Sequence, residues 1–258
     1  MQRNTYIPAE RQKKMVEYIE SNTSAQIHDL SEYFGVSEAT VRRDLDDLDR
    51  QGAIRRTHGG AIKLDRSTSF EQMYNEKLAF CTEEKRRIAE AAARLVHDGD
   101  TVFIDAGTTT LQVALALSHK ENLTMITNDL HIAYSTPARP TASMICTGGV
   151  RRQGRQELIG SIAEDFIRNS HVNLAFLGAD AVDLNLGVTI ANFEEVGVKR
   201  ALVNSSLKTV LVADHTKFGG VALVKICDVA DCAAIITDSA LPEETVQKYR
   251  RARVDLIL

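Results

Sequence analysis

A short polar run, DAGTTT at residues 105–110, combines groups that can bind an anion. A glycine-threonine turn that opens a helix offers backbone N–H groups, hydroxyls and the positive end of the helix dipole. Together these groups suit a phosphate. The run matches neither the nucleotide-binding pattern G-x-x-x-x-G-K-[S/T] nor the dinucleotide pattern G-x-G-x-x-G. It therefore predicts a phosphate site of another kind.

Other charged side chains in the same part of the chain complement a phosphate. Carboxylates can accept hydrogen bonds from sugar hydroxyls, and lysines can offset the phosphate charge. These side chains are Asp105, Asp180, Asp214, Lys199 and Lys217. The combination describes a site for a small phosphorylated sugar or polyol.

Each of these features also has an ordinary structural explanation. A glycine-threonine turn often only joins a strand to a helix, and an aspartate after a strand commonly caps a helix. Glu195 and Lys199 are four residues apart, the usual spacing of a surface ion pair. His215 reads as a solvated loop histidine, to which we assign no role. The site prediction rests on the recurrence of the features, not on any one of them.

Recurrence matters because the elements that carry these residues have one expected arrangement. Short apolar runs alternate with helical stretches, which favours an open, largely parallel α/β sheet covered on both faces. The predicted strands are 101–105, 123–127, 142–147, 174–178, 209–213, 233–237 and 254–257, with helices at 110–118, 130–134, 159–168, 193–205 and 242–251. Ligands of such sheets bind at the carboxyl ends of the strands, where the polar clusters fall.

A second functional region is indicated near the N-terminus, where the sequence predicts two short helices joined by a tight turn. Gly35 can adopt the positive φ that ends one helix, and Ser37 can cap the next. Val41, Leu45 and Leu48 then recur at helical spacing and define its apolar face.

The opposite face of this helix has the layout of a DNA-recognition helix. At about 100° per residue, Ala39, Thr40 and Arg43 fall opposite the apolar stripe, with Arg42 on the flank. Small and donor-rich residues at the start of such a helix meet base edges in the major groove. Asp47 shares this face, and phosphate would repel it unless it pairs with Arg43.

The neighbouring segments complete a winged helix-turn-helix. Residues 8–21 predict a first helix, and Ile27, Leu30, Tyr33 and Phe34 supply the apolar stripe of the second. Residues 23–25 read as a break between them. Gln51-Gly52 is expected to end the third helix, and residues 54–63 predict a two-stranded basic wing with a glycine turn. The residues expected to face DNA are Ser37, Ala39, Thr40, Arg42, Arg43, Arg55, Arg56 and His58.

The stretch VSEATVRRDLDDLDRQGAIRRTHGGA resembles the DNA-binding signature of the DeoR family of bacterial transcription regulators. DAGTTT, TND, TGGVRR, LGAD, EEVGVKRA and VADHTKFG resemble successive motifs of that family's sensor domain, so the resemblance covers nearly the whole chain. It implies a DNA-binding regulator, a repressor of a carbohydrate uptake or catabolism operon, controlled by a phosphorylated sugar. The implied sensor fold is an open α/β domain that resembles ribose-5-phosphate isomerase.

The resemblance also implies which residues contact the effector and where the domains lie. The effector residues would be Asp105, Gly107, Thr108, Thr109, Thr110, Asn128, Gly149, Asp180, Glu195, Lys199, Asp214 and Lys217. We expect a DNA-binding domain at 1–64, a linker at 65–77 and a sensor domain at 78–258.

Composition sets the remaining expectations. The net charge is −4, and residues 1–66 carry 11 basic and 11 acidic residues, so DNA binding must depend on where the charges lie. No apolar run can span a bilayer and no signal peptide is evident, which favours a cytoplasmic protein. The four cysteines form no C-x-x-C pair, and we expect buried thiols, no metal site and no cofactor. A symmetric homo-oligomer, dimer or tetramer, would place two recognition helices on paired half-sites.

Two other functions remain open at this level. One is a sugar-phosphate isomerase with an accessory DNA-binding module. That enzyme needs a carboxylate base, and its motif has an acid after Gly-Ala-Asp where this chain has Ala181. Its later lysine-glycine motif is matched only loosely by residues 217–220, so binding is favoured over catalysis. The other is a regulator that has lost effector control and acts through oligomerisation alone.

Overall fold

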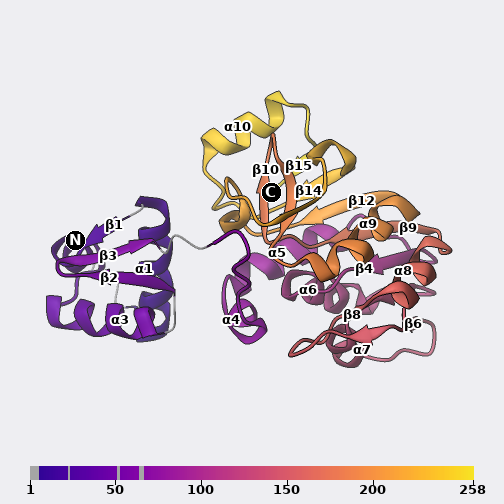
Figure 1. Cartoon of the computed structure of the whole chain (residues 1–258), viewed down its shortest axis with the longest axis horizontal. Helices are drawn as coiled ribbons and strands as arrows, with labels where there is room; N and C mark the ends of the chain where they lie inside the picture. Colours follow the sequence, from indigo (N-terminus) through magenta and orange to yellow (C-terminus); the bar gives the residue numbers. More distant parts are fainter. Residues whose placement is uncertain (1–5, 23, 51–52, 64–66) are drawn as a thin grey trace. The chain divides into compact units, whose positions relative to one another are not determined.

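The computed structural model describes residues 6–22, 24–50, 53–63 and 67–258 (Figure 1). Its contacts divide the chain into two compact units, residues 1–66 and 67–258. Residues 67–77, which we expected in a linker, pack within the second unit. The Leu223 N–H, for example, donates to the Thr68 carbonyl at 2.8 Å. Gln51 and Gly52, expected to end the third helix, lie outside the described residues.

The first unit is a winged helix-turn-helix. Its elements are α1 (Pro8–Asn22), β1 (Ser24–Gln26), α2 (Ile27–Phe34), α3 (Glu38–Arg50), β2 (Ile54–Thr57) and β3 (Gly60–Lys63). Met15, Ile19, Leu30, Leu45 and Ile54 are fully buried and form its core. The predicted apolar stripes therefore hold, except that Tyr33 is 66% exposed and its ring packs at a tilt against that of Tyr18.

The wing contains one strand more than the sequence indicated. Ser24–Gln26, expected within a break, pairs antiparallel with β3, and the sheet order is β1-β3-β2. Gly60 permits this close pairing, because a Cβ at that position would lie 2.0 Å from the Ala25 carbonyl oxygen. The strand was missed because three residues are too few to establish a period of two.

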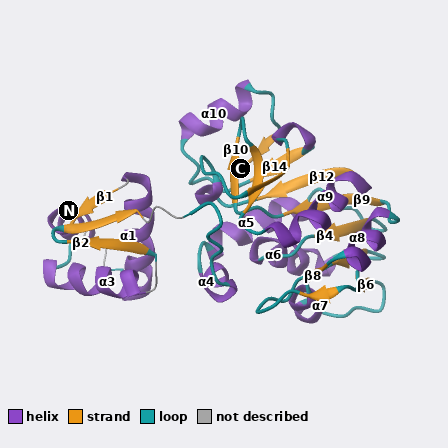
Figure 2. Ribbon diagram, in the orientation of Figure 1, coloured by secondary structure: helices purple, strands orange, loops and turns teal. Residues whose placement is uncertain are grey.

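The second unit is built on a seven-stranded sheet in the order β15-β14-β12-β9-β4-β5-β6, with every pair parallel (Figure 2). Its strands are β4 (Thr101–Ile104), β5 (Thr124–Thr127), β6 (Ser143–Cys146), β9 (Val172–Leu177), β12 (Ser206–Val212), β14 (Ala234–Ile236) and β15 (Leu256–Ile257). Each lies within or near its predicted range, since strands buried on both faces read as continuous apolar runs.

Helices cover both faces of this sheet. They are α4 (Tyr74–Ala79), α5 (Thr82–Ala93), α6 (Thr108–Ala116), α7 (Leu130–Ser135), α8 (Ser161–Arg168), α9 (Val196–Ser205) and α10 (Glu243–Arg251). Alternate strand residues enter two separate cores: Val102 and Ile104 pack with α5 and α6, whereas Phe103 packs with α8 and α9. The period of two along a strand produces this division.

Small antiparallel elements were not predicted. They are the sheet β10 (Ala181–Asp183), β11 (Gly187–Ile190) and β13 (Val224–Cys227), and the pair β7 (Val150–Arg151) and β8 (Leu158–Ile159). Single 3₁₀ turns lie at η1 (Leu117–His119), η2 (Phe193–Glu195), η3 (His215–Lys217) and η4 (Val229–Asp231).

Two further observations concern the expectations from composition. Cys81, Cys227 and Cys232 are buried as expected, but Cys146 is exposed. The apolar run around Cys146 forms β6, which is the last strand of the sheet and has a neighbour on one side only. Among the helices of the described residues, none has the length and apolar character that crossing a bilayer requires.

Candidate functional site

The turn before α3 has the geometry that the sequence indicated. Gly35 ends α2 with φ 65°, and its N–H donates to the Ser31 carbonyl. The Ser37 hydroxyl oxygen accepts from the Thr40 N–H at 3.2 Å and lies 2.9 Å from the Thr40 hydroxyl. Ser37 thereby satisfies one of the N–H groups that a helix start leaves without a partner.

The outward face of α3 presents the expected side chains to solvent. Ala39 and Arg43 are exposed, and Thr40 is half-buried. The Arg42 side chain is 53% exposed and donates to Glu38 at 2.8 Å, one turn earlier. Among the described residues, neither Arg43 nor Arg55 makes a side-chain hydrogen bond or ion pair. These guanidinium groups can bind phosphate or guanine without first breaking a bond.

The aspartates of α3 make hydrogen bonds and ion pairs within the first unit. Asp44 is buried and accepts from the Arg11 guanidinium of α1 at 2.6 and 3.2 Å. Asp47 pairs with Arg50 and accepts from Gln12, not from Arg43 as considered above. Asp49 accepts from the Arg56 N–H at 2.9 Å. The acids therefore hold the unit together, and a local basic face exists although the unit has no net charge.

The wing divides the expected DNA-facing residues into two groups. Arg55 and His58 are exposed. The Arg56 side chain is only 22% exposed and pairs with Asp46 of α3. It also donates to the Arg42 carbonyl at 3.4 Å. Arg56 thus fixes the wing against α3, a role that strand spacing alone does not show.

The second unit contains a pocket where the order of its strands reverses. The chain runs from β4 through β5 to β6 on one side, and from β9 through β12 to β15 on the other. Ligands of open α/β sheets bind at such a point, beyond the carboxyl ends of the strands. Nine of the twelve expected effector residues line this pocket: Gly107, Thr108, Thr109, Thr110, Asp180, Glu195, Lys199, Asp214 and Lys217.

Lys199 and Glu195 do not form the surface ion pair that their spacing allows. The Lys199 side chain is 4% exposed and its ammonium donates to Asp105, with Glu195 Oε2 at 3.7 Å. Burial alone would lower the pKa of Lys199, but the carboxylates of Asp105 and Glu195 hold it above its ordinary value. Asp105 is fully buried and also accepts from the Gly178 N–H at 2.9 Å. It supports the pocket from beneath and does not line it.

The other charged groups of the pocket differ in the hydrogen bonds and ion pairs that they already make within the protein. Asp180 accepts from Lys77 Nζ at 2.7 Å and from the Ala191 N–H at 3.0 Å. Asp214 accepts from the N–H and hydroxyl of Thr216 and so caps η3. The Lys217 side chain makes no hydrogen bond or ion pair with the described residues. Its ammonium is therefore the cation in this pocket that a ligand can bind at least cost.

Two expected effector residues lie away from the pocket. Asn128 is buried and its amide donates to the Leu158 carbonyl at 3.3 Å. Gly149 packs on α8, since a Cβ there would lie 2.8 Å from the Ile159 carbonyl oxygen and 3.2 Å from the Ala163 Cβ. Both connect the β7–β8 loop to the body of the unit. Asp129 caps α7, accepting from the His131 N–H at 2.7 Å.

The structure adds pocket residues that sequence reasoning missed. Arg152 is buried and bonds to Glu71, to Glu194 at 3.2 Å and to Glu195 at 2.8 Å. Arg155 also pairs with Glu71, at 3.2 Å. The added lining residues are Glu71, Gln72, Tyr74, Lys77, Phe80, Lys85, Arg155 and Glu157. Residues 71–80 therefore form one wall of the pocket, which we call the strap.

Lys85, in α5 next to the strap, is a buried cation of the pocket. Its ammonium donates to the Phe80 carbonyl at 2.6 Å and to the Lys77 carbonyl. Burial lowers the pKa of Lys85 to about 8, although the Asp214 carboxylate opposes the shift. Arg152 belongs to the TGGVRR run, but its partner Glu71 is distant in sequence, so spacing could not have linked them.

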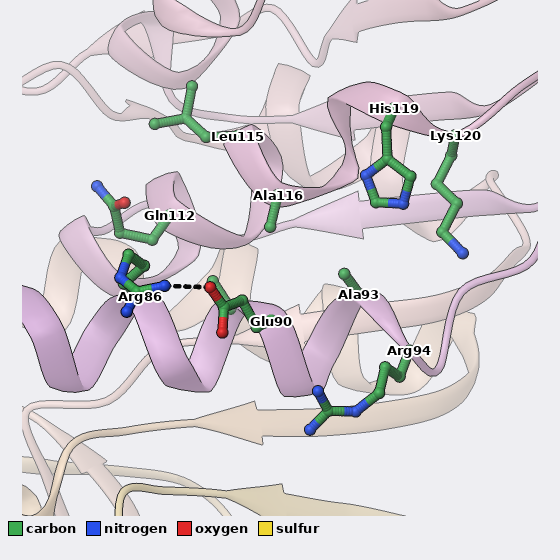
Figure 3. Close-up of a pocket in the computed structure, with 10 residues that line it drawn as sticks. Arg86, Glu90, Ala93, Arg94, Gln112, Leu115, Ala116, His119 and Lys120 are labelled. Carbon is green, nitrogen blue, oxygen red and sulfur yellow. Dashed lines mark hydrogen bonds and ion pairs between the residues drawn. The ribbon is translucent and has the colours of Figure 1, made fainter.

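A wider groove lies on the outer surface, between α5 and α6 (Figure 3). Its volume is about 480 Å³, and its lining includes Ala89, Ala93 and Ala116. An Arg86–Glu90 ion pair borders it. None of the expected effector residues lines this groove. The pocket at the strand ends, which nine of the expected effector residues line, is therefore the candidate effector site.

Comparison with known proteins identifies a family for both parts of the chain. Residues 11–67 match the model of the DeoR-like helix-turn-helix domain, and residues 81–239 match that of the DeoR C terminal sensor domain. The chain is 34% identical over 251 residues to the HTH-type transcriptional regulator GlpR of Haloferax volcanii, covering 97% of this chain and 98% of that protein. It is also 34% identical over 249 residues to the glycerol-3-phosphate regulon repressor of Escherichia coli K12, covering 96% and 98%.

Solved structures give a weaker likeness. Ribose 5-phosphate isomerase from Plasmodium falciparum has a TM-score of 0.38 and 15% identity, over 52% of each chain. This likeness is too low to support an argument about activity, and the relatives similar over their full length are named as regulators, not enzymes. The two family models and the full-length relatives establish that this chain belongs to the DeoR family of DNA-binding transcriptional regulators.

Proposed function

We propose that this protein represses a carbohydrate uptake or catabolism operon and that a phosphorylated sugar, bound at the carboxyl ends of β4, β9 and β12, controls its binding to the operator. In this proposal it acts in the cytoplasm as a symmetric dimer or tetramer, which presents two α3 helices to paired half-sites. A related E. coli protein is named a repressor of the glycerol-3-phosphate regulon, which supports a phosphorylated metabolite as effector.

The observation that carries the proposal is the distribution of charge in the pocket. The N-terminus of α6 supplies Thr108, Thr109 and the positive end of a helix dipole, and Lys217 supplies an ammonium that makes no hydrogen bond or ion pair with the described residues. Asp180 and Asp214 lie in the same pocket and can accept from hydroxyls. A ligand with a phosphate at one end and hydroxyls along its length complements this arrangement.

Control of DNA binding requires that the ligand distinguish between two arrangements of the protein. The strap provides a physical route, because it lines the pocket and lies close in sequence to the end of the DNA-binding unit at residue 66. It is attached by the Glu71–Arg152 and Lys77–Asp180 ion pairs. A phosphate competes with Glu71 for Arg155 and changes the charge around Lys77. Effector binding therefore alters the attachment of the strap.

Two binding experiments test the proposal. Fluorescence anisotropy with the DNA upstream of the protein's own gene should show specific binding that weakens as salt rises. Calorimetry with a panel of sugar phosphates should find one that binds, whereas the same sugar without its phosphate should not. Lys217→Ala should abolish that binding. The control Lys208→Ala, at an exposed lysine of β12, should leave it unchanged. Absence of specific DNA binding would overturn the regulator proposal, and equal binding of sugars with and without phosphate would overturn the effector assignment.

A further inference from the structure

We propose that Cys81, Asp214 and His215 form a binding site for a divalent transition-metal cation of the zinc class. Each offers one ligand atom, and these three atoms all lie within 4.8 Å of one another. Cys81 directly precedes α5, and the other two follow β12. The three residues are far apart in sequence and meet because α5 packs near the carboxyl end of β12, so cysteine spacing gave no sign of the site.

The donor set and its burial fit this class of cation. Thiolate sulfur, imidazole nitrogen and carboxylate oxygen are the ligands that zinc uses in proteins, whereas calcium and magnesium require oxygen ligands. Cys81 is fully buried and Asp214 is 1% exposed. Both hydrogen bonds from Thr216 go to Asp214 Oδ1, so we assign the cation to Oδ2.

The surroundings of His215 supply a second, independent observation. Asp238 is 2% exposed, and its Oδ1 lies 2.9 Å from His215 Nδ1. The backbone N–H of His215 also donates to Asp238 Oδ2 at 2.8 Å. Histidines that bind metal usually give their other ring nitrogen to a carboxylate, which fixes the tautomer and the ring. We therefore assign Nε2 to the cation. His215 is not the solvated loop histidine that its position suggested.

The nearest cation described is the Lys85 ammonium, which is attracted by the Cys81 and Asp214 side chains. Lys85 donates to the Phe80 and Lys77 carbonyls, so its hydrogen bonds are directed to the strap. A thiolate and a carboxylate together carry two negative charges, which a divalent cation neutralises at the lowest cost in a buried position.

Other clusters in the described residues lack this combination. Glu71, Glu157 and Glu195 also approach within 4.8 Å of one another. Arg152 already pairs with all three, so their charge is compensated without a metal. Cys227 and Cys232 are buried free thiols that share a side-chain hydrogen bond. That thiol pair serves as an internal control for the test.

The test uses the full-length protein, treated with a chelator and then titrated with Co²⁺, whose absorption reports thiolate ligation and tetrahedral geometry. One cobalt ion should bind per chain, with a thiolate-to-cobalt band. Cys81→Ala should lose the band, and Cys232→Ala, at another buried thiol, should retain it. Asp238→Asn should weaken the affinity by about 10- to 100-fold while keeping the band, because it only positions His215.

Three results would overturn the inference. They are the absence of stoichiometric binding, a band of unchanged strength in Cys81→Ala, and loss of the band in Cys232→Ala with retention in Cys81→Ala. If Cys81→Ala does not fold, X-ray absorption of the zinc-loaded wild type replaces it. One sulfur ligand among nitrogen and oxygen ligands supports the site, and none or two contradict it. Asp214 also lines the proposed effector pocket, but these readouts require neither DNA nor effector, so failure of the metal site and failure of the proposed function can be distinguished.

Discussion

The two units use the same charged residue types in opposite ways. On α3 and the wing, Arg42, Arg43 and Arg55 are exposed, and only Arg42 has a partner among the described residues. In the sensor unit, Lys199 and Arg152 are buried and each contacts at least two carboxylates. The first arrangement can exchange its partners for phosphates, whereas the second fixes the shape of a pocket.

This difference predicts different consequences of mutation. Removing an exposed guanidinium leaves no buried charge behind, so the loss appears in DNA binding and not in folding. Removing a buried cation leaves carboxylates without compensation in a poorly solvated interior, so the loss appears in stability.

The largest expected effect is that of Lys199→Met. The substitution leaves the fully buried Asp105 carboxylate without its cation, and we expect a loss of about 3–5 kcal/mol in the free energy of unfolding. Denaturant unfolding followed by circular dichroism measures it. The double variant Lys199→Met/Asp105→Leu should recover much of the loss. If Lys199→Met is as stable as the wild type, the buried Lys199–Asp105 ion pair does not stabilise the fold as described here.

A smaller effect is expected for Arg43→Ala. Loss of one base or phosphate contact should weaken operator binding by about 1–3 kcal/mol, with stability and effector affinity unchanged. Anisotropy titration measures the DNA affinity. Arg50→Ala is the matched control, since Arg50 is also exposed on α3 but lies in its last turn and pairs with Asp47. Equal losses in the two variants would show that only general positive charge matters.

Arg56→Met should reduce both the stability of the protein and its affinity for DNA. Its pair with Asp46 is partly exposed, so we expect a loss of about 1 kcal/mol in stability together with weaker DNA binding, because the wing is less firmly held. Thermal unfolding and anisotropy on the same samples measure both. A loss of DNA affinity with no change in stability would instead make Arg56 a direct DNA contact.

The smallest effect concerns the pH dependence of the Lys77–Asp180 pair. Burial alone would raise the pKa of the Asp180 carboxyl, but the Lys77 ammonium and the Ala191 N–H hold that pKa well below its ordinary value. Its contribution to stability is therefore present above about pH 4, the ordinary pKa of an aspartate, and is lost as the pH falls further. Unfolding free energies measured from pH 6 downward should fall more for wild type than for Asp180→Asn. Parallel curves would remove this pair from the attachment of the strap.

The sequence predicted the framework better than the side-chain partners. The runs that form β4, β9 and β12 were recognisable because strands buried on both faces are continuously apolar. Gly35 and Ser37 were recognisable because turn and cap chemistry is local. Nine expected residues line one pocket because the carboxyl ends of parallel strands share one edge.

What the sequence did not show depends on contacts between distant segments. Glu71 meets Arg152, Lys77 meets Asp180 and Cys81 meets His215 across long sequence separations. Cys146 was misjudged because an apolar run does not reveal which strand lies at the edge of the sheet. Asn128 and Gly149 follow strands, as the pocket residues do, but strands β5 and β6 lie beyond the point where the strand order reverses.

The central claim is that ligand binding in the pocket and operator binding are coupled, and one measurement tests it most directly. Operator affinity is titrated by anisotropy with and without each member of a sugar phosphate panel, for wild type and for Lys217→Ala. We predict that one phosphorylated sugar shifts the operator affinity of wild type by about 5- to 150-fold and that Lys217→Ala abolishes the shift without changing the affinity in its absence. A wild-type operator affinity that no sugar phosphate alters, or a shift that persists in Lys217→Ala, would contradict the account.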